Sequence, residues 1–342
     1  MFFDIAILFV ALLIIVFSAE LFTNGIEWLG QRLELSEGVV GSVLAAVGTA
    51  LPETLIPIVA VAFFGREHGA EVGIGAIAGA PFMLSTLTLG LCGLSAFYFA
   101  KKGRRTKELK LNEVVLGRDL RFFMMAYTAA LVASFAPADP VIRYVIAGLI
   151  FLVYPVYLYQ TFSAEGEMGA EPEPLYMTKI VKLESKKLRL IIPQVTIALA
   201  GIVGGAYIFV EFIQNIAQDI GFPPLVLSLI VSPIATELPE KINSVLWARN
   251  GKDTLALGNV TGALVFQSCI PVAFGIGFTK WNLDTGTLLT GAVAVCSALV
   301  WFLFLKQKKL SSNLLMMGAI VYTVAVALLI QLDIPASGGH GH

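Results

Sequence analysis

Two short motifs with the same spacing, Thr-x-x-Pro-Glu, lie inside apolar segments of this sequence. The first runs from Thr49 to Glu53 and the second from Thr236 to Glu240. Residues four positions apart share one face of a helix, so each motif presents a hydroxyl beside a carboxylate. Oxygen ligands of this kind suit hard cations such as Ca²⁺ and Mg²⁺ better than soft metals. The motifs therefore predict a cation-binding site.

The proline of each motif adds backbone ligands. Because proline lacks an N–H group, Pro52 leaves the carbonyl of Gly48 without its helical partner, and Pro239 does the same to Ala235. In an apolar environment such a carbonyl is tolerated only where a cavity, water or an ion satisfies it. The alternative, a glutamate that only caps a broken helix, accounts less well for two matched copies.

The composition places both motifs in a membrane protein. Of 342 residues, 57% are hydrophobic and 14% are charged, against about 25% charged residues in soluble domains. The net charge of −1 gives no reason to expect a nucleic-acid partner. The three cysteines lie singly in apolar runs and predict neither a disulfide framework nor a metal cluster. The first apolar segment lacks a basic start and is expected to be a retained membrane helix.

Ten segments are long and apolar enough to be membrane-spanning helices. They cover residues 2–30, 38–63, 72–100, 120–136, 140–162, 189–217, 223–247, 255–278, 285–305 and 312–332. A basic, amphipathic segment (101–121) follows the third span, and a polar, acidic linker (163–188) follows the fifth. The linker is expected to be solvated and mobile at its start. Residues 333–342 form a tail.

Basic residues predict the orientation. With the N-terminus outside, nineteen lysines and arginines fall in inner loops and three in outer loops, while Lys241 lies inside a span. The positive-inside rule therefore favours both termini outside and both polar segments in the cytoplasm. A multi-pass protein of the plasma or inner membrane is expected.

The two halves, 1–162 and 189–332, repeat each other. Three pairs of elements recur in the same order: the Thr-x-x-Pro-Glu motifs, Gly75/Gly79 with Gly258/Gly262, and Glu20/Asn24 with Glu211/Asn215. Each unit has five spans, so the units must be inverted, as in secondary transporters with a site near the midplane. The glycines predict close helix packing around that site. The predicted fold is all-α, with ten membrane helices in two inverted five-helix repeats.

These motifs resemble the repeats of the cation/calcium exchanger superfamily, which includes the sodium/calcium exchangers. The pattern Gly-Thr-Ser-x-Pro-Glu corresponds to residues 48–53 and 235–240, and Gly-Asn-x-x-Gly to 258–262 and more weakly to 75–79. The resemblance implies an antiporter with ion sites between spans two, three, seven and eight. It also implies that spans one and six slide against the rest. The ligands it implies are Thr49, Glu53, Thr236 and Glu240, with the carbonyls of Gly48 and Ala235.

The neighbouring spans depart from the pattern of that superfamily. Ala80 and Ala263 replace a serine, and Leu84 and Gln267 stand where an asparagine or aspartate is usual. An amide oxygen of Gln267 therefore remains as a candidate ligand, and several other oxygens are lost. The serines one position further along, Ser85 and Ser268, are rotated about 100° around the helix.

Three further acidic residues allow two interpretations each. Glu237 is a candidate ligand, but Lys241 lies one turn away in the favourable order for an ion pair. The ammonium either neutralises Glu237 or takes the place of a transported cation. Glu20 and Glu211 either hydrogen-bond the asparagine one turn on or relay protons or cations along the access path.

The leading functional prediction is exchange of Ca²⁺ for Na⁺ or H⁺, with inorganic cations and lipid as the partners and no cofactor. A second possibility keeps the fold but serves Mg²⁺, monovalent cations alone, or ion sensing without sustained transport. An intramembrane enzyme is not expected, because the histidines lie outside the spans and no nucleophile–base motif occurs.

Overall fold

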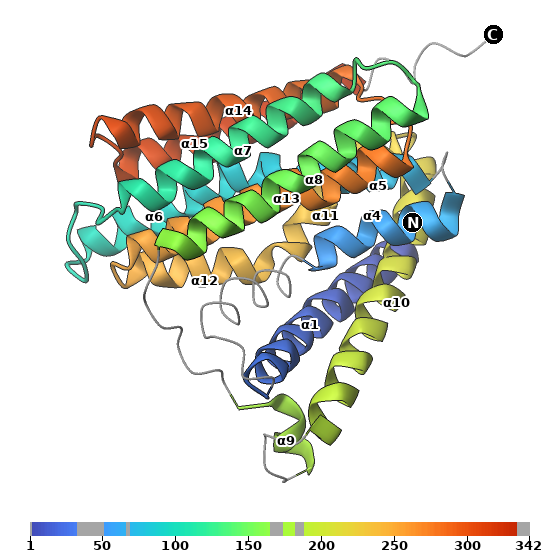
Figure 1. The fold of residues 1–342 in the computed structure, drawn as a ribbon, viewed down its shortest axis with the longest axis horizontal. Helices are drawn as coiled ribbons and strands as arrows, with labels where there is room; N and C mark the ends of the chain where they lie inside the picture. Colours follow the sequence, from blue (N-terminus) through green and yellow to red (C-terminus); the bar gives the residue numbers. More distant parts are fainter. Residues whose placement is uncertain (1, 33–50, 66–68, 165–173, 182–187, 334–342) are drawn as a thin grey trace.

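The computed structural model describes residues 2–32, 51–65, 69–164, 174–181 and 188–333, and these residues form helices without any β-strand. Figure 1 shows how the helices lie. In chain order they are α1 (Phe2–Arg32), α4 (Leu51–Phe64), α5 (Ala70–Met83), η3 (Leu84–Thr88), α6 (Leu89–Lys101), α7 (Glu113–Ala133), α8 (Pro140–Ala164), α9 (Tyr176–Val181), α10 (Leu188–Ile220), α11 (Pro224–Thr236), α12 (Leu238–Arg249), α13 (Asp253–Phe278), α14 (Thr285–Lys306) and α15 (Ser312–Asp333).

Seven of the described helical segments are long and apolar enough to cross a membrane. They are α1, the continuous run of α5, η3 and α6, then α8, α10, α13, α14 and α15. Helices α4 and α11 are apolar but short, and α7 carries charged residues in its first half. The chain is thus an all-helical, multi-pass membrane protein, and every predicted span overlaps one of these helices.

Helix α7 begins earlier than the predicted span 120–136. The Asn112 side chain accepts hydrogen bonds from the backbone N–H groups of Val114 and Val115 and so caps the helix. The basic segment expected over 101–121 therefore ends as a loop at Asn112. Arg118 and Asp119, which that segment included, are buried in the bundle at 6% and 1% exposure.

The third span contains a π-helical turn, η3, that begins at Leu84, where the exchanger pattern has an asparagine or aspartate. There the Thr86 hydroxyl donates to the carbonyl of Phe82, and the indole N–H of Trp301 donates to the carbonyl of Ser85 at 2.8 Å. A π-turn disturbs the regular helical ladder, and these side-chain groups satisfy the carbonyls involved.

The apolar interior is divided between two main groups of helices. The larger cluster joins α5 to α8 with α11 to α15, while a second cluster gathers residues of α1, α4 and α10 with parts of α5 and α11. Figure 1 shows α1 and α10 side by side, below the layer that the other long helices form. The two helices therefore pack chiefly on each other.

Gly75 and Gly79 let α5 approach α11 closely. A methyl group added at Gly75 would lie 2.2 Å from the carbonyl oxygen of Leu225, and one at Gly79 would lie 2.1 Å from that of Leu229. The predicted close packing is confirmed for this pair. The matching glycines of α13 differ: at Gly258 no described atom lies within 4 Å, and at Gly262 the nearest is the Tyr157 hydroxyl at 3.6 Å.

Gly79→Ala is therefore expected to destabilise the protein by about 1–3 kcal/mol, because the added methyl overpacks a backbone contact. Gly262→Ala is the matched control, since it makes the same chemical change in a helix with room for a methyl group. Thermal unfolding in detergent measures both. Equal stability of the two variants would contradict the close approach of α5 and α11.

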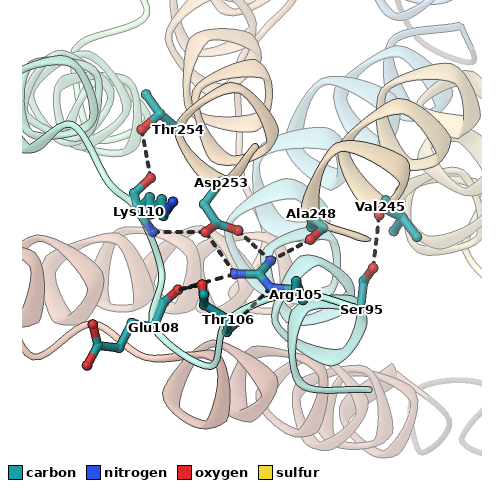
Figure 2. A network of polar contacts seen from close by, with 9 residues as sticks. All are labelled: Ser95, Arg105, Thr106, Glu108, Lys110, Val245, Ala248, Asp253 and Thr254. Carbon is teal, nitrogen blue, oxygen red and sulfur yellow. Dashed lines mark hydrogen bonds and ion pairs between the residues drawn. The ribbon is translucent and has the colours of Figure 1, made fainter. Parts of the chain in front are cut away.

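A buried ion pair fastens the loop before α7 to the start of α13 (Figure 2). Arg105 donates from Nη1 to Asp253 Oδ1 at 2.6 Å and from Nη2 to Oδ2 at 2.8 Å. Asp253 also accepts from the backbone N–H of Lys110 at 2.9 Å, and Arg105 donates to the carbonyl of Ala248. Loop 102–112 is thereby joined to the turn between α12 and α13.

Part of the predicted linker is folded. Residues 176–181 form the short helix α9, and Leu175 before it is fully buried. Asn24 of α1 accepts from the backbone N–H of Tyr176 at 3.1 Å and from Gln194 of α10 at 3.0 Å. This segment of 163–188 therefore docks on both α1 and α10, whereas the sequence predicted a solvated stretch.

Candidate functional site

The second Thr-x-x-Pro-Glu motif interrupts a helix in the apolar interior. Helix α11 ends at Thr236, α12 begins at Leu238, and Glu237 lies between them with its side chain fully buried. Pro239 falls in the first turn of α12, where its missing N–H costs nothing. The final carbonyls of α11 therefore face a break, and the negative end of a helix dipole attracts cations there.

Lys241 occupies part of this break. Its Nζ donates to the carbonyl of Pro233 at 2.6 Å and lies 3.5 Å from the carbonyl oxygen of Ile234. The same atom is 2.9 Å from the Met83 sulfur and 3.6 Å from Glu237 Oε2. The ion pair that the sequence predicted is present, although the shortest contact of the ammonium is with a backbone carbonyl.

The first motif is described only in part. Glu53 lies in the first turn of α4 and is 3% exposed. Gly48 and Thr49 lie outside the described residues. Because α4 packs against α5, α11 and α13, Glu53 belongs to a helix that touches α11, where the second motif begins.

The other predicted ligands occupy helices around the break. Thr236 is buried, and its hydroxyl donates to the carbonyl of Ser232 at 3.1 Å. Ala235 and Glu240 lie in α11 and α12, and the structure describes their backbone but not their side chains. Gln267 is 2% exposed in α13, and no described group donates a hydrogen bond to its Oε1. A buried acceptor of this kind suits a cation.

In the third span, the positions that depart from the exchanger pattern offer no side-chain oxygen. Ala80 and Leu84 are buried apolar residues of the third span. Ser85 and Ser268 donate to carbonyls of their own helices, those of Phe82 and Val265, at 3.3 and 2.9 Å. Their hydroxyl groups are thus engaged locally, in keeping with the predicted rotation away from the site.

Sequence reasoning missed a second buried polar cluster, formed by Arg118, Asp119, Tyr157 and Thr261. Asp119 accepts from Thr261 at 2.7 Å, from Tyr157 at 3.2 Å and from Arg118 at 3.4 Å. These contacts join α7 and α8 to α13, so the cluster holds the helix that carries Gln267. The sequence feature that could have indicated this cluster is the pair Arg118-Asp119 at the start of an apolar run.

Glu20 and Glu211 lie on the exposed sides of α1 and α10. Glu20 Oε1 accepts a hydrogen bond from the Tyr176 hydroxyl at 2.8 Å. This contact ties Glu20 to the docked linker.

Comparison with known proteins agrees with this architecture. The family model described as sodium/calcium exchanger protein matches residues 3–162 and 191–330. An uncharacterised membrane protein of Methanocaldococcus jannaschii is 24% identical over 321 residues, which cover 93% of this chain and 95% of that protein. The sodium/calcium exchanger MaX1 of Methanosarcina acetivorans is 23% identical, with 94% and 97% covered.

Two solved exchangers share the fold. The crystal structure of the H⁺/Ca²⁺ exchanger CAX superposes with a TM-score of 0.72 at 18% identity, covering 97% of this chain and 87% of that one. The sodium-calcium exchanger NCX_Mj gives a TM-score of 0.59 at 20% identity, covering 95% and 98%. Since the family model matches most of its length, this chain belongs to the sodium/calcium exchanger protein family.

Proposed function

We propose that this chain is a secondary-active antiporter that exchanges Ca²⁺ for Na⁺ or H⁺ by alternating access. The proposed ligands come from the two motifs and from α13. They are Thr49, Glu53, Thr236 and Glu240, the carbonyls of Gly48 and Ala235, and additionally Glu237 and Gln267. No cofactor and no enzymatic step is needed, because one divalent ion or two monovalent ions neutralise the same pair of carboxylates.

The observation that carries the proposal is the helix break at Glu237. It brings carbonyl ends, the Thr236 hydroxyl and the Glu237 carboxylate into the apolar interior, where unsatisfied polar groups are costly. Discontinuous helices that meet near the midplane are the usual source of cation ligands in secondary transporters. The unsatisfied Gln267 oxygen supports the same location.

The proposed topology has ten spans in two inverted repeats, 1–162 and 189–332. Both termini lie on the outer side of the plasma or inner membrane. The two short apolar helices, α4 and α11, would each complete a span with neighbouring residues. The extensive packing of α1 on α10 supports a moving pair of helices. Alternating access would then expose the site first to one side and then to the other.

A second candidate keeps the fold and changes the ion. The buried Ala80 and Leu84 remove oxygens from one wall of the site, and this favours a cation that needs fewer protein ligands. Mg²⁺, which keeps several of its waters, and monovalent cations fit that description. Ion sensing without sustained transport also remains in this class.

Flux of radioactive Ca²⁺ into proteoliposomes under imposed Na⁺ or H⁺ gradients tests the leading function, with Mg²⁺ as competitor. Gradient-driven Ca²⁺ uptake is expected. Calorimetry on the purified protein separates the candidates, because heat with Mg²⁺ or Na⁺ but none with Ca²⁺ would reject Ca²⁺ exchange in favour of the second.

A further inference from the structure

The sequence places one more acidic residue at the proposed site than the matched positions of the two motifs supply. Glu53, Glu237 and Glu240 together carry three negative charges, and Lys241 supplies one positive charge. Where that ammonium binds decides whether it is simply the partner of Glu237 or part of the cation site.

The contacts of Lys241 are those of a bound cation. Its Nζ lies 2.6 Å from the carbonyl oxygen of Pro233, which is hydrogen-bond distance, but 3.6 Å from Glu237 Oε2, which is beyond it. The carbonyl oxygen of Ile234 is 3.5 Å away. Carbonyls at the end of a broken helix, together with a carboxylate, are the ligands that hold Na⁺ in discontinuous transporter helices.

The Lys241 ammonium and the groups that bind it are buried. The Lys241 side chain is 9% exposed and that of Glu237 is fully buried. The Met83 sulfur, a weak acceptor, closes the α5 side of the ammonium at 2.9 Å. In an apolar interior, the carbonyl and carboxylate oxygens offset the cost of taking the ammonium out of water.

We propose that the Lys241 ammonium is a tethered cation that permanently fills a monovalent-cation subsite made by the carbonyls of Pro233 and Ile234 and the carboxylate of Glu237. If the chain is an antiporter, as proposed above, the remaining site carries two negative charges. One Ca²⁺ or two monovalent cations neutralise it, so the exchange moves no net charge. Without Lys241 the site takes one additional monovalent cation and the exchange becomes electrogenic.

Lys241→Gln tests the subsite directly. The variant is expected to gain thermal stability in Na⁺ relative to choline at equal ionic strength, because Na⁺ then binds the vacated oxygens of the folded protein. The wild type should show a smaller Na⁺ effect. Glu237→Gln/Lys241→Gln is the matched control, since it removes the carboxylate with the ammonium and should lose the added Na⁺ effect.

Transport in proteoliposomes provides the second readout. If each exchange cycle moves one net charge, a membrane potential of about 100 mV shifts the equilibrium Ca²⁺ distribution about 50-fold. If the cycle moves no net charge, the potential leaves that distribution unchanged. The wild type is expected to ignore the potential, whereas Lys241→Gln should follow it.

Equal stability of Lys241→Gln in Na⁺ and choline would overturn the tethered cation and leave a purely structural ion pair. If that variant does not fold in either salt, the wild type decides, since voltage-driven wild-type exchange contradicts the proposal. Absence of any wild-type Ca²⁺ flux would reject Ca²⁺ antiport instead, while the Na⁺-specific stabilisation of Lys241→Gln would still report on the subsite.

Discussion

Glu53→Gln and Glu240→Gln are each expected to abolish cation exchange while the protein stays folded. The substitution keeps the size of the side chain and removes its charge, so the site can no longer neutralise a divalent ion. Loss of one partner of a buried charge pair costs about 2–5 kcal/mol, which corresponds to about 30-fold to 4,000-fold weaker binding. Ca²⁺ flux into proteoliposomes and calorimetric Ca²⁺ binding measure the effect.

Glu108→Gln is the matched control, because it makes the same change at an exposed loop position. It should exchange ions at the wild-type rate. Unchanged flux in Glu53→Gln would exclude that carboxylate from the site, and an unfolding temperature close to the wild type would show that any lost flux is not caused by unfolding.

Arg105→Met is expected to destabilise the protein by about 3–5 kcal/mol, because it leaves the Asp253 carboxylate buried without its bidentate partner. The side chains of this pair are 2% and 1% exposed. The double variant Arg105→Met/Asp253→Leu should recover part of the loss, since neither charge then stays buried. Thermal and chemical unfolding in detergent measure all three proteins.

The exposed pair Lys308–Glu113 provides the control for this prediction. Lys308 Nζ lies 3.8 Å from Glu113 Oε1, so this is also a pair of opposite charges, but its side chains are 79% and 35% exposed. Lys308→Met should therefore cost less than about 1 kcal/mol. A comparable loss in both variants would show that the Arg105–Asp253 bond does not hold the loop before α7 to α13.

The helical architecture could be predicted from the sequence because long apolar segments have few alternatives in a membrane. All backbone groups must be paired within the segment, so each apolar run becomes a helix. The boundaries were less predictable where a polar side chain decided them. Asn112 starts α7 before the apolar run does. The π-turn η3 begins at Leu84, three residues after Pro81, and the apolar run continues through both.

The candidate site was predictable in its residue types and only partly in its geometry. The repeated spacing of threonine, proline and glutamate predicted two matched breaks, and the break at Glu237 is present. The two glycine pairs match in sequence but not in packing. A methyl group added at Gly79 would collide with the α11 backbone, whereas one at Gly262 would lie at ordinary contact distance, 3.6 Å, from the Tyr157 hydroxyl. Internal repetition specifies similar helices, but different neighbours surround each copy.

The sequence by itself determined that this protein is a helical membrane protein with paired, cation-suited motifs, because hydropathy and ligand chemistry are properties of the residues. Only the tertiary structure decided what Lys241 contacts. The spacing of Glu237 and Lys241 allowed an ion pair within one helix. That pair is present at 3.6 Å, but the lysine side chain also reaches back across the break to Pro233, where α5 supplies Met83 on the other side. That choice depends on how α5, α11 and α12 pack, which no local pattern encodes.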